Sequence, residues 1–234
     1  MKFILPLLSN LVISFACFAQ HSNAIEKKKS TIIVDGLSND WVAYNNTTIS
    51  SSNISYSVVN DNKMIYFLFK FPEKNSQLKF LRAGLEIKID TLGKNKYPIS
   101  VIFPYSTDRE NNDPLSHSFT GITPNMDFES KKQTLLKNST KIKITNFKNG
   151  LTDVMLNQIN TINVLSAINF DSTNTLNYEI AFPINMFFES DISTYKTPFN
   201  FQFNLLGLPY SVSESSDSRY FENNTILLKS KLAQ

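Results

Sequence analysis

The chain of 234 residues is poor in the residues that build disulfides and metal sites. It contains one cysteine, Cys17, and two histidines, His21 and His117. A single cysteine cannot form an intramolecular disulfide, so a packed core must stabilise the fold. The net charge is only +3, with both signs mixed along the chain. The absence of a basic stripe argues against a dedicated nucleic-acid surface.

The first nineteen residues predict an export signal, because Lys2 precedes a mostly apolar run over 3–12 and a small-x-small cleavage site at Cys17–Ala19. That run is too short for a permanent transmembrane helix, and no later segment is apolar enough to be one. We expect cleavage after this site and a periplasmic or secreted mature chain without cysteine. Lipidation of Cys17 is the alternative, but Ser14 stands where a lipoprotein signal has a leucine-like residue.

The remaining chain predicts one all-β domain. We expect a flexible leader over 20–30, a single domain over 31–229 and a tail over 230–234. Short β-prone runs at regular spacing predict an antiparallel β-sandwich, jelly-roll-like, of about ten or eleven strands with at most one or two short helices. The expected strands are 31–34, 47–50, 54–60, 64–71, 85–90, 99–104, 141–147, 162–170, 176–182, 199–206 and 225–229.

The hydropathy pattern also predicts how individual segments are buried. Strand 85–90 alternates apolar and charged residues, which indicates one buried face and one wet face. Strand 64–71 is apolar almost throughout, which predicts a central strand covered on both faces. Asn60-Asp61-Asn62 predicts a tight hairpin with left-handed backbone angles. We expect an irregular, functional or poorly ordered loop over 105–138, and a short helix over 151–159.

Two short sequences read as strand-to-turn corners. The first is Val34-Asp35-Gly36, followed by Trp41, the only tryptophan. Gly36 permits a sharp turn, Asp35 accepts hydrogen bonds from the turn, and the Trp41 ring is expected to be buried under the sheet. The second runs from Asn177 to Pro183. There Glu179 is expected to hold a neighbouring turn or lysine, and Pro183 to end the strand.

Together with the hairpin over 54–66 and the strand over 84–90, these corners resemble family 9 carbohydrate-binding modules and the related DOMON-like sandwich domains. The resemblance spans 31–229 and extends to exported proteins of Bacteroidota. It implies a non-catalytic module that holds a sugar between exposed aromatic rings. Because Trp41 belongs to the corner, tyrosine or phenylalanine would have to replace tryptophan in that platform. Tyrosine beside arginine in a loop is one such arrangement, and the alternative is that these residues only anchor loops. The candidates are Tyr105, Arg109, Tyr195, Tyr210, Arg219 and Tyr220.

No metal or cofactor is predicted. The acidic loop residues Asp108, Asp113, Asp127 and Asp171 are conceivable calcium ligands, but no calcium-loop spacing is matched and solvated turns are favoured. The DOMON-like resemblance raises haem ligation through Met and His. His117 with Met64 or Met126 is the conceivable set, since His21 lies in the leader. A surface loop histidine is the favoured interpretation.

No catalytic residue is predicted either, because the sequence has neither a Gly-x-Ser-x-Gly elbow nor a cysteine after the signal. Glu86 and Asp90 share a strand face roughly 13 Å apart at ~3.3 Å per residue. Glycosidase pairs need about 5–9.5 Å, so both are expected to be solvated. Two hypotheses remain: an exported non-catalytic module that binds a glycan or glycoconjugate, or a structural or protein-interaction component of the cell envelope without a small ligand.

Overall fold

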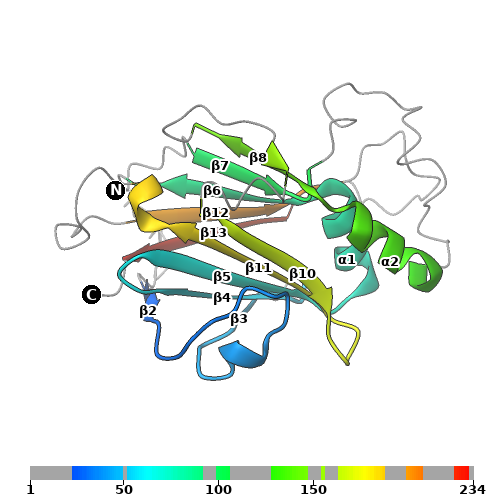
Figure 1. Ribbon diagram of the computed structural model, residues 1–234, viewed down its shortest axis with the longest axis horizontal. Helices are drawn as coiled ribbons and strands as arrows, with labels where there is room; N and C mark the ends of the chain where they lie inside the picture. Colours follow the sequence, from blue (N-terminus) through cyan, green and yellow to red (C-terminus); the bar gives the residue numbers. More distant parts are fainter. Residues whose placement is uncertain are drawn as a thin grey trace, which may run out of the picture.

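The computed structural model describes residues 23–49, 52–91, 99–105, 128–146, 154–155, 163–187, 199–207 and 224–231. Within these ranges two largely antiparallel sheets pack face to face, which confirms the predicted all-β sandwich (Figure 1). No helix in the described part of the chain is long and apolar enough to cross a membrane.

The seven-stranded sheet has the order β1 (Asn23–Ala24), β13 (Asn224–Lys231), β12 (Phe199–Leu205), β6 (Leu85–Asp90), β7 (Ile99–Phe103), β8 (Lys141–Thr145) and β9 (Val154–Met155). The six-stranded sheet has the order β10 (Leu165–Phe170), β11 (Leu176–Pro183), β5 (Met64–Phe71), β4 (Ile54–Asn60) and β2 (Glu26–Lys27), and β3 (Thr47–Ile49) also pairs with β4.

Strands β4, β5 and β6 have the predicted bounds. Residues 31–34 form no strand, and the helix expected over 151–159 is wrong at 154–155, where β9 pairs with β8.

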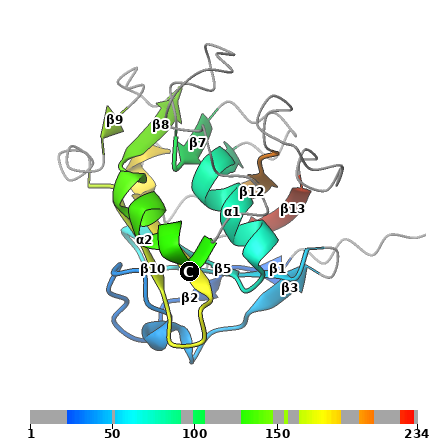
Figure 2. The same ribbon diagram turned by 90° about the vertical axis from the view of Figure 1, so that its right-hand side faces the viewer.

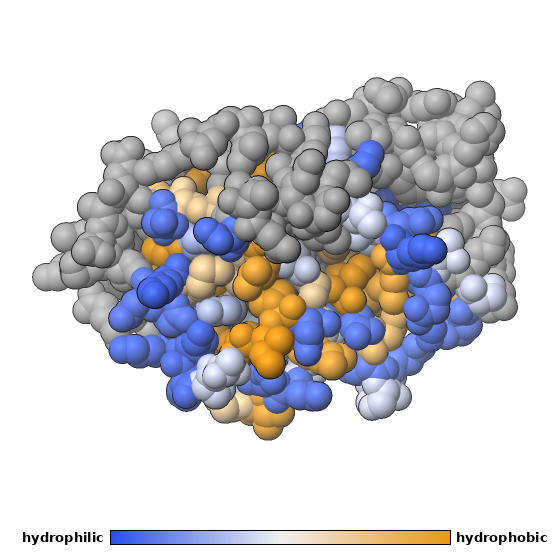
Figure 3. Space-filling view, in the orientation of Figure 1, coloured by the Kyte–Doolittle hydropathy of each residue, from blue (hydrophilic) through white to orange (hydrophobic). Residues whose placement is uncertain are grey.

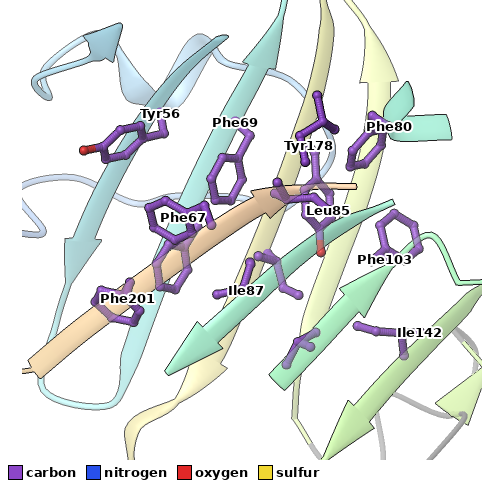
Figure 4. Close-up of a cluster of buried hydrophobic side chains, with 14 of the residues drawn as sticks. Tyr56, Phe67, Phe69, Phe80, Leu85, Ile87, Phe103, Ile142, Tyr178 and Phe201 are labelled. Carbon is purple, nitrogen blue, oxygen red and sulfur yellow. The ribbon is translucent and has the colours of Figure 1, made fainter. Parts of the chain in front are cut away.

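The main core lies between the two sheets and is rich in aromatic rings (Figure 4). Phe67 of β5 packs edge-on against Phe201 and Phe203 of β12, with ring centroids 5.0 and 5.9 Å apart. Leu85, Ile87 and Ile89 of β6 point into the same space. Edge-to-face ring pairs add to the free energy gained by burying apolar area.

Strand β5 is covered on both faces, as predicted. Its second face carries Tyr66 and Leu68, which pack against Trp41 and Tyr44 of the segment between β2 and β4. This outer cluster also includes Ile32, Val59 and Ala181. Figure 1 shows that segment lying across the outer side of the six-stranded sheet. Two cores on opposite faces explain why β5 shows no alternation.

Two helices, α1 (Lys74–Ala83) and α2 (Phe128–Asn138), lie side by side across one end of the sandwich (Figures 1 and 2). Phe80 of α1 reaches the core, with its ring centroid 4.7 Å from that of Phe71. Gly84 ends α1 with φ +88°, and a side chain there would collide with the Pro104 carbonyl oxygen. Helix α2 corrects the prediction of an irregular loop over 105–138 for residues 128–138.

The predicted flexible leader is wrong for residues 23–30, which we call the strap. Strand β1 pairs with β13 of one sheet, β2 pairs with β4 of the other, and Ile25 between them is buried in the main core. The Tyr44 hydroxyl accepts hydrogen bonds from the Lys29 and Ser30 backbone N–H groups at 2.8 and 2.9 Å. The strap therefore joins the two sheets at one side of the sandwich.

Asp61 fastens the strap to the hairpin between β4 and β5. Its Oδ2 lies 2.6 Å from Lys28 Nζ, and its Oδ1 accepts from the backbone N–H groups of Lys63 and Met64 at 2.8 Å each. The predicted hairpin is present, but neither Asp61 nor Asn62 has the positive φ that we expected. Burial alone would raise the pKa of Asp61, but the hydrogen bonds from Lys28 and the backbone outweigh it and lower that pKa.

The corner formed by Asp35, Gly36 and Trp41 is organised by the buried carboxylate of Glu179 on β11. Its Oε2 accepts from the backbone N–H groups of Asp35 and Gly36 at 2.9 and 2.6 Å, and its Oε1 accepts from Trp41 Nε1 at 2.6 Å. Gly36 has φ +81°, and a side chain there would meet the Ile168 carbonyl carbon at 2.7 Å. Burial raises the pKa of Glu179, and the three donors offset only part of that effect.

We expect Glu179→Gln to lower the free energy of unfolding by about 2 kcal/mol or more, because an amide N–H₂ would then face groups that can only donate. Chemical denaturation of the variant and the parent measures this loss. Glu129→Gln on the exposed side of α2 is the matched control, expected to change stability by less than about 0.5 kcal/mol. Equal losses in the two variants would contradict the role of Glu179.

We expect Asp61→Asn to cost about 1 kcal/mol at neutral pH, since the amide keeps an acceptor for the turn but loses the ion pair with Lys28. A folded-state pKa below the ordinary 3.8 means that this stability is present above pH 3.8 and is lost as the pH falls through the lowered value. Denaturation at a series of pH values should show a shallower acid limb for the variant. An unchanged acid limb would show that the pair contributes nothing.

We expect Tyr178→Phe to leave stability unchanged or to raise it by up to about 1 kcal/mol. The Tyr178 hydroxyl is fully buried and makes no hydrogen bond of ordinary geometry with the described residues, although the neighbouring Ser166 hydroxyl on β10 offsets part of the rise that burial causes in its pKa. Burying a hydroxyl without a hydrogen bond destabilises the folded state, and phenylalanine has no hydroxyl to bury. Thermal unfolding measures the change, and a clear fall in the midpoint would reveal a partner for this group.

Candidate binding surface

The outer face of the seven-stranded sheet carries a row of polar side chains. The same alternation that buries the apolar residues of β6, β7 and β12 turns their other side chains away from the core. The register places Asn204 opposite Glu86, and Lys88 between Gln202 and Ser100. We call Glu86, Lys88, Ser100, Gln202 and Asn204 the amide–carboxylate row.

Glu86 is the centre of this row. Its Oε2 accepts from Asn204 Nδ2 at 2.8 Å and lies 3.4 Å from Lys88 Nζ, while its Oε1 accepts from Ser100 Oγ at 2.8 Å. Gln202 Nε2 donates in turn to Asn204 Oδ1 at 3.0 Å. These contacts hold side chains from three strands in fixed orientations, because a carboxylate and an amide in one network restrict each other's rotation.

Apolar side chains flank the row on both sides. Leu227 of β13 lies opposite Gln202 and is 59% exposed, and Ile102 of β7 lies opposite Glu86 and is half-buried. The row itself supplies amide, hydroxyl, ammonium and carboxylate groups, which include both donors and acceptors. A ligand that has both hydroxyl groups and an apolar face matches this combination of groups.

Tyr105 is not the exposed platform that the sequence predicts. It is 6% exposed, and Lys143 Nζ lies 4.9 Å from its ring centroid and donates to its hydroxyl at 3.3 Å. Tyr105 follows β7, and its backbone N–H donates to the Lys141 carbonyl oxygen at 3.0 Å. The remaining predicted platform residues lie outside the described residues: Arg109, Tyr195, Tyr210, Arg219 and Tyr220.

The acidic residues form no metal site in the part of the chain that the structure describes, where no group of three or more His, Cys, Asp or Glu gathers. Asp171 Oδ1 accepts from the N–H groups of Thr173 and Thr175 at 2.9 and 3.0 Å, so it stabilises the turn between β10 and β11. Met64 is half-buried against the outer cluster. The other residues that were weighed as conceivable ligands fall outside the described residues: Asp108, Asp113, Asp127, His21, His117 and Met126.

Glu86 and Asp90 share one face of β6, as predicted, but they differ in burial. Asp90 is 1% exposed and accepts from Asn200 Nδ2 at 3.4 Å, so the prediction that it is solvated is wrong. From the sequence alone, Glu86 reads only as a residue on the wet face of its strand. The alternating amides Asn200, Gln202 and Asn204 on β12 were the signal for this site, because solubility alone does not require amides at every second position.

Comparison with known proteins gives a limited result. No protein-family model matches the chain, and no curated protein matches it. Among solved structures, a family 9 carbohydrate-binding module from Caldicellulosiruptor kristjanssonii in complex with glucose is similar over 90% of this chain and 96% of its own, with 9% identity and a TM-score of 0.41. The same kind of module from that organism in complex with cellotriose covers 91% and 95%, with 10% identity and a TM-score of 0.41. At identities of 9% and 10% and TM-scores of 0.41, these similarities support no conclusion about function.

Proposed function

We propose that this chain is an exported, non-catalytic binding module whose ligand is a glycan or glycoconjugate, held on the amide–carboxylate row. The observation that carries the proposal is the hydrogen-bonded set around Glu86, in which three strands hold amide, hydroxyl, ammonium and carboxylate groups in fixed orientations. Asn204 lies buried at the base of this set, and the other four side chains are half-buried. Sugars offer vicinal hydroxyls that both donate and accept. A surface that already holds both kinds of group in place loses little side-chain entropy on binding.

The shape and charge of the surface support the same class of ligand. The row lies on strands rather than on loops, so its polar groups keep their spacing. The exposed Leu227 and half-buried Ile102 offer apolar surface for the C–H face of a sugar ring. Glu86 and Lys88 carry opposite charges and lie within ion-pair distance, which favours a neutral glycan over a strongly charged one.

Export is part of the proposal and is supported by the apolar run and the cleavage site in the first nineteen residues. The strap begins at Asn23, so cleavage after Ala19 would leave every strap residue in the mature chain. We propose that the mature protein begins at Gln20 and so lacks Cys17, the one cysteine of this sequence.

Affinity gel electrophoresis of this mature protein against a panel of neutral polysaccharides tests the proposal. We expect at least one of them to retard migration, and Gln202→Ala to weaken binding roughly fivefold, the loss that corresponds to about one hydrogen bond. Gln133→Ala on the exposed side of α2 is the matched control and should bind like the parent.

Two results would contradict the proposal. One is a correctly folded sample, verified by circular dichroism and a cooperative thermal transition, that no polysaccharide retards. The other is retardation that Gln202→Ala and Gln133→Ala change equally, which would move the binding site away from the amide–carboxylate row.

A further inference from the structure

The register of the seven-stranded sheet places one side chain from each of five neighbouring strands in a line across its outer face. Gln202 of β12 lies opposite Leu227 of β13 and Lys88 of β6, and Ser100 of β7 lies opposite Lys88 and Thr145 of β8. Directly opposed residues of antiparallel strands share a face, and the residues next to these along each strand pack in the main core. We call this outward-facing set the cross-strand line: Leu227, Gln202, Lys88, Ser100 and Thr145.

The cross-strand line is the most accessible line of side chains on this face. Leu227 is 59% exposed, and the other four side chains are half-buried. The parallel line on one side passes through the buried Asn204, and the line on the other side passes through the buried Asn200 and Asp90. A ligand on this face therefore meets the groups of the cross-strand line along its whole length.

Hydrogen bonds from the neighbouring line fix the polar members of the cross-strand line. Gln202 Nε2 donates to Asn204 Oδ1 at 3.0 Å, and Glu86 accepts from Ser100 Oγ at 2.8 Å and lies 3.4 Å from Lys88 Nζ. Gln202 Oε1 and the Ser100 oxygen can still accept, and the ammonium group between them can still donate. Acceptors and donors thus alternate from strand to strand. A chain of hydroxyl-bearing rings satisfies this alternation, because each hydroxyl both donates and accepts.

The spacing of the strands sets the length and shape of the ligand that fits. Neighbouring strands lie about 4.8 Å apart, so the line measures roughly 19 Å from Leu227 to Thr145. The advance per sugar in an extended glycan chain is close to one strand spacing. The cross-strand line therefore offers about one contact for each of four or five successive sugars, whereas a glycan that coils into a helix leaves the line after a few sugars.

We infer, on the basis of the proposed function, that the glycan bound on this surface is an extended, β-linked chain that lies across the strands along the cross-strand line. The six-stranded sheet presents a different surface, since Figure 3 shows apolar side chains gathered where β10 and β11 lie in Figure 1. The alternating donors and acceptors of the cross-strand line match sugar hydroxyls, and its exposed Leu227 matches the C–H face of one ring.

Isothermal titration calorimetry of the mature protein with β-linked gluco-, manno- and xylo-oligosaccharides, from two to six sugars long, tests this inference. We expect at least one series to bind roughly fivefold more tightly with each added sugar up to four or five sugars, because each strand adds about one hydrogen bond, and no more tightly beyond that length. Malto-oligosaccharides of the same lengths are α-linked and coil, so the longer ones should bind roughly tenfold more weakly or not at all.

Thr145→Val removes the hydroxyl at the β8 end of the cross-strand line and keeps a β-branched side chain on the strand. We expect this variant to bind the longest oligosaccharide roughly fivefold more weakly and the disaccharide like the parent, because two sugars can occupy the rest of the line. Thr48→Val, at an exposed threonine on β3 of the other sheet, is the matched control and should bind both like the parent.

Three results would overturn the inference: a disaccharide that binds as tightly as the longest member of its series, malto-oligosaccharides that bind as tightly as every β-linked series, and Thr145→Val and Thr48→Val variants of equal affinity for the longest oligosaccharide. Failure of every β-linked series to bind would overturn it as well. In each case, polysaccharide retardation that Gln202→Ala weakens would leave the proposed function standing. Retardation by no polysaccharide would overturn both.

Discussion

The structure depends on one buried carboxylate. Glu179 accepts hydrogen bonds from the Asp35 and Gly36 backbone and from the Trp41 indole, which lie more than a hundred residues earlier in the chain. Those contacts fix the corner against the six-stranded sheet, and the corner in turn holds Trp41 and Tyr44 over the outer face of β5. Without that cover, Tyr66 and Leu68 would expose a large apolar surface to water. The buried Glu179 carboxylate therefore holds in place the outer cluster around Trp41, Tyr44, Tyr66 and Leu68.

Much of the sandwich could be predicted from the sequence, because alternation along a strand is a local property. It gave the bounds of β4, β5 and β6, and the residue types at the corner indicated that Glu179 would hold a turn. Helix α1 was missed because Lys79 and Arg82 are buried in it and disguise its apolar face. Burial lowers the pKa of Arg82 to about 10, which illustrates how far this environment departs from a solvated helix. Strands as short as β1 and β2 carry no periodic signal at all.

The candidate site escaped sequence analysis for a different reason. Glu86, Ser100 and Asn204 each look like an ordinary polar residue on a wet face. They become a network only through the pairing of β6 with β7 on one side and β12 on the other. Register between distant strands is not readable from any one of them. Tyr105 shows the converse error, since an aromatic residue after a strand resembles a platform until its burial is known.

The pairing of Asn23 with Ser230 has a consequence for biogenesis. β1 and β13, the first and last strands of the described residues, belong to the same sheet, so the seven-stranded sheet cannot be completed until β13 has been made. If the chain is threaded through a translocon, its N-terminal portion must wait on the far side with the seven-stranded sheet unfinished. Contacts so distant in sequence slow folding. A holdase that shields Phe-rich strands during that interval would therefore raise the yield of native protein.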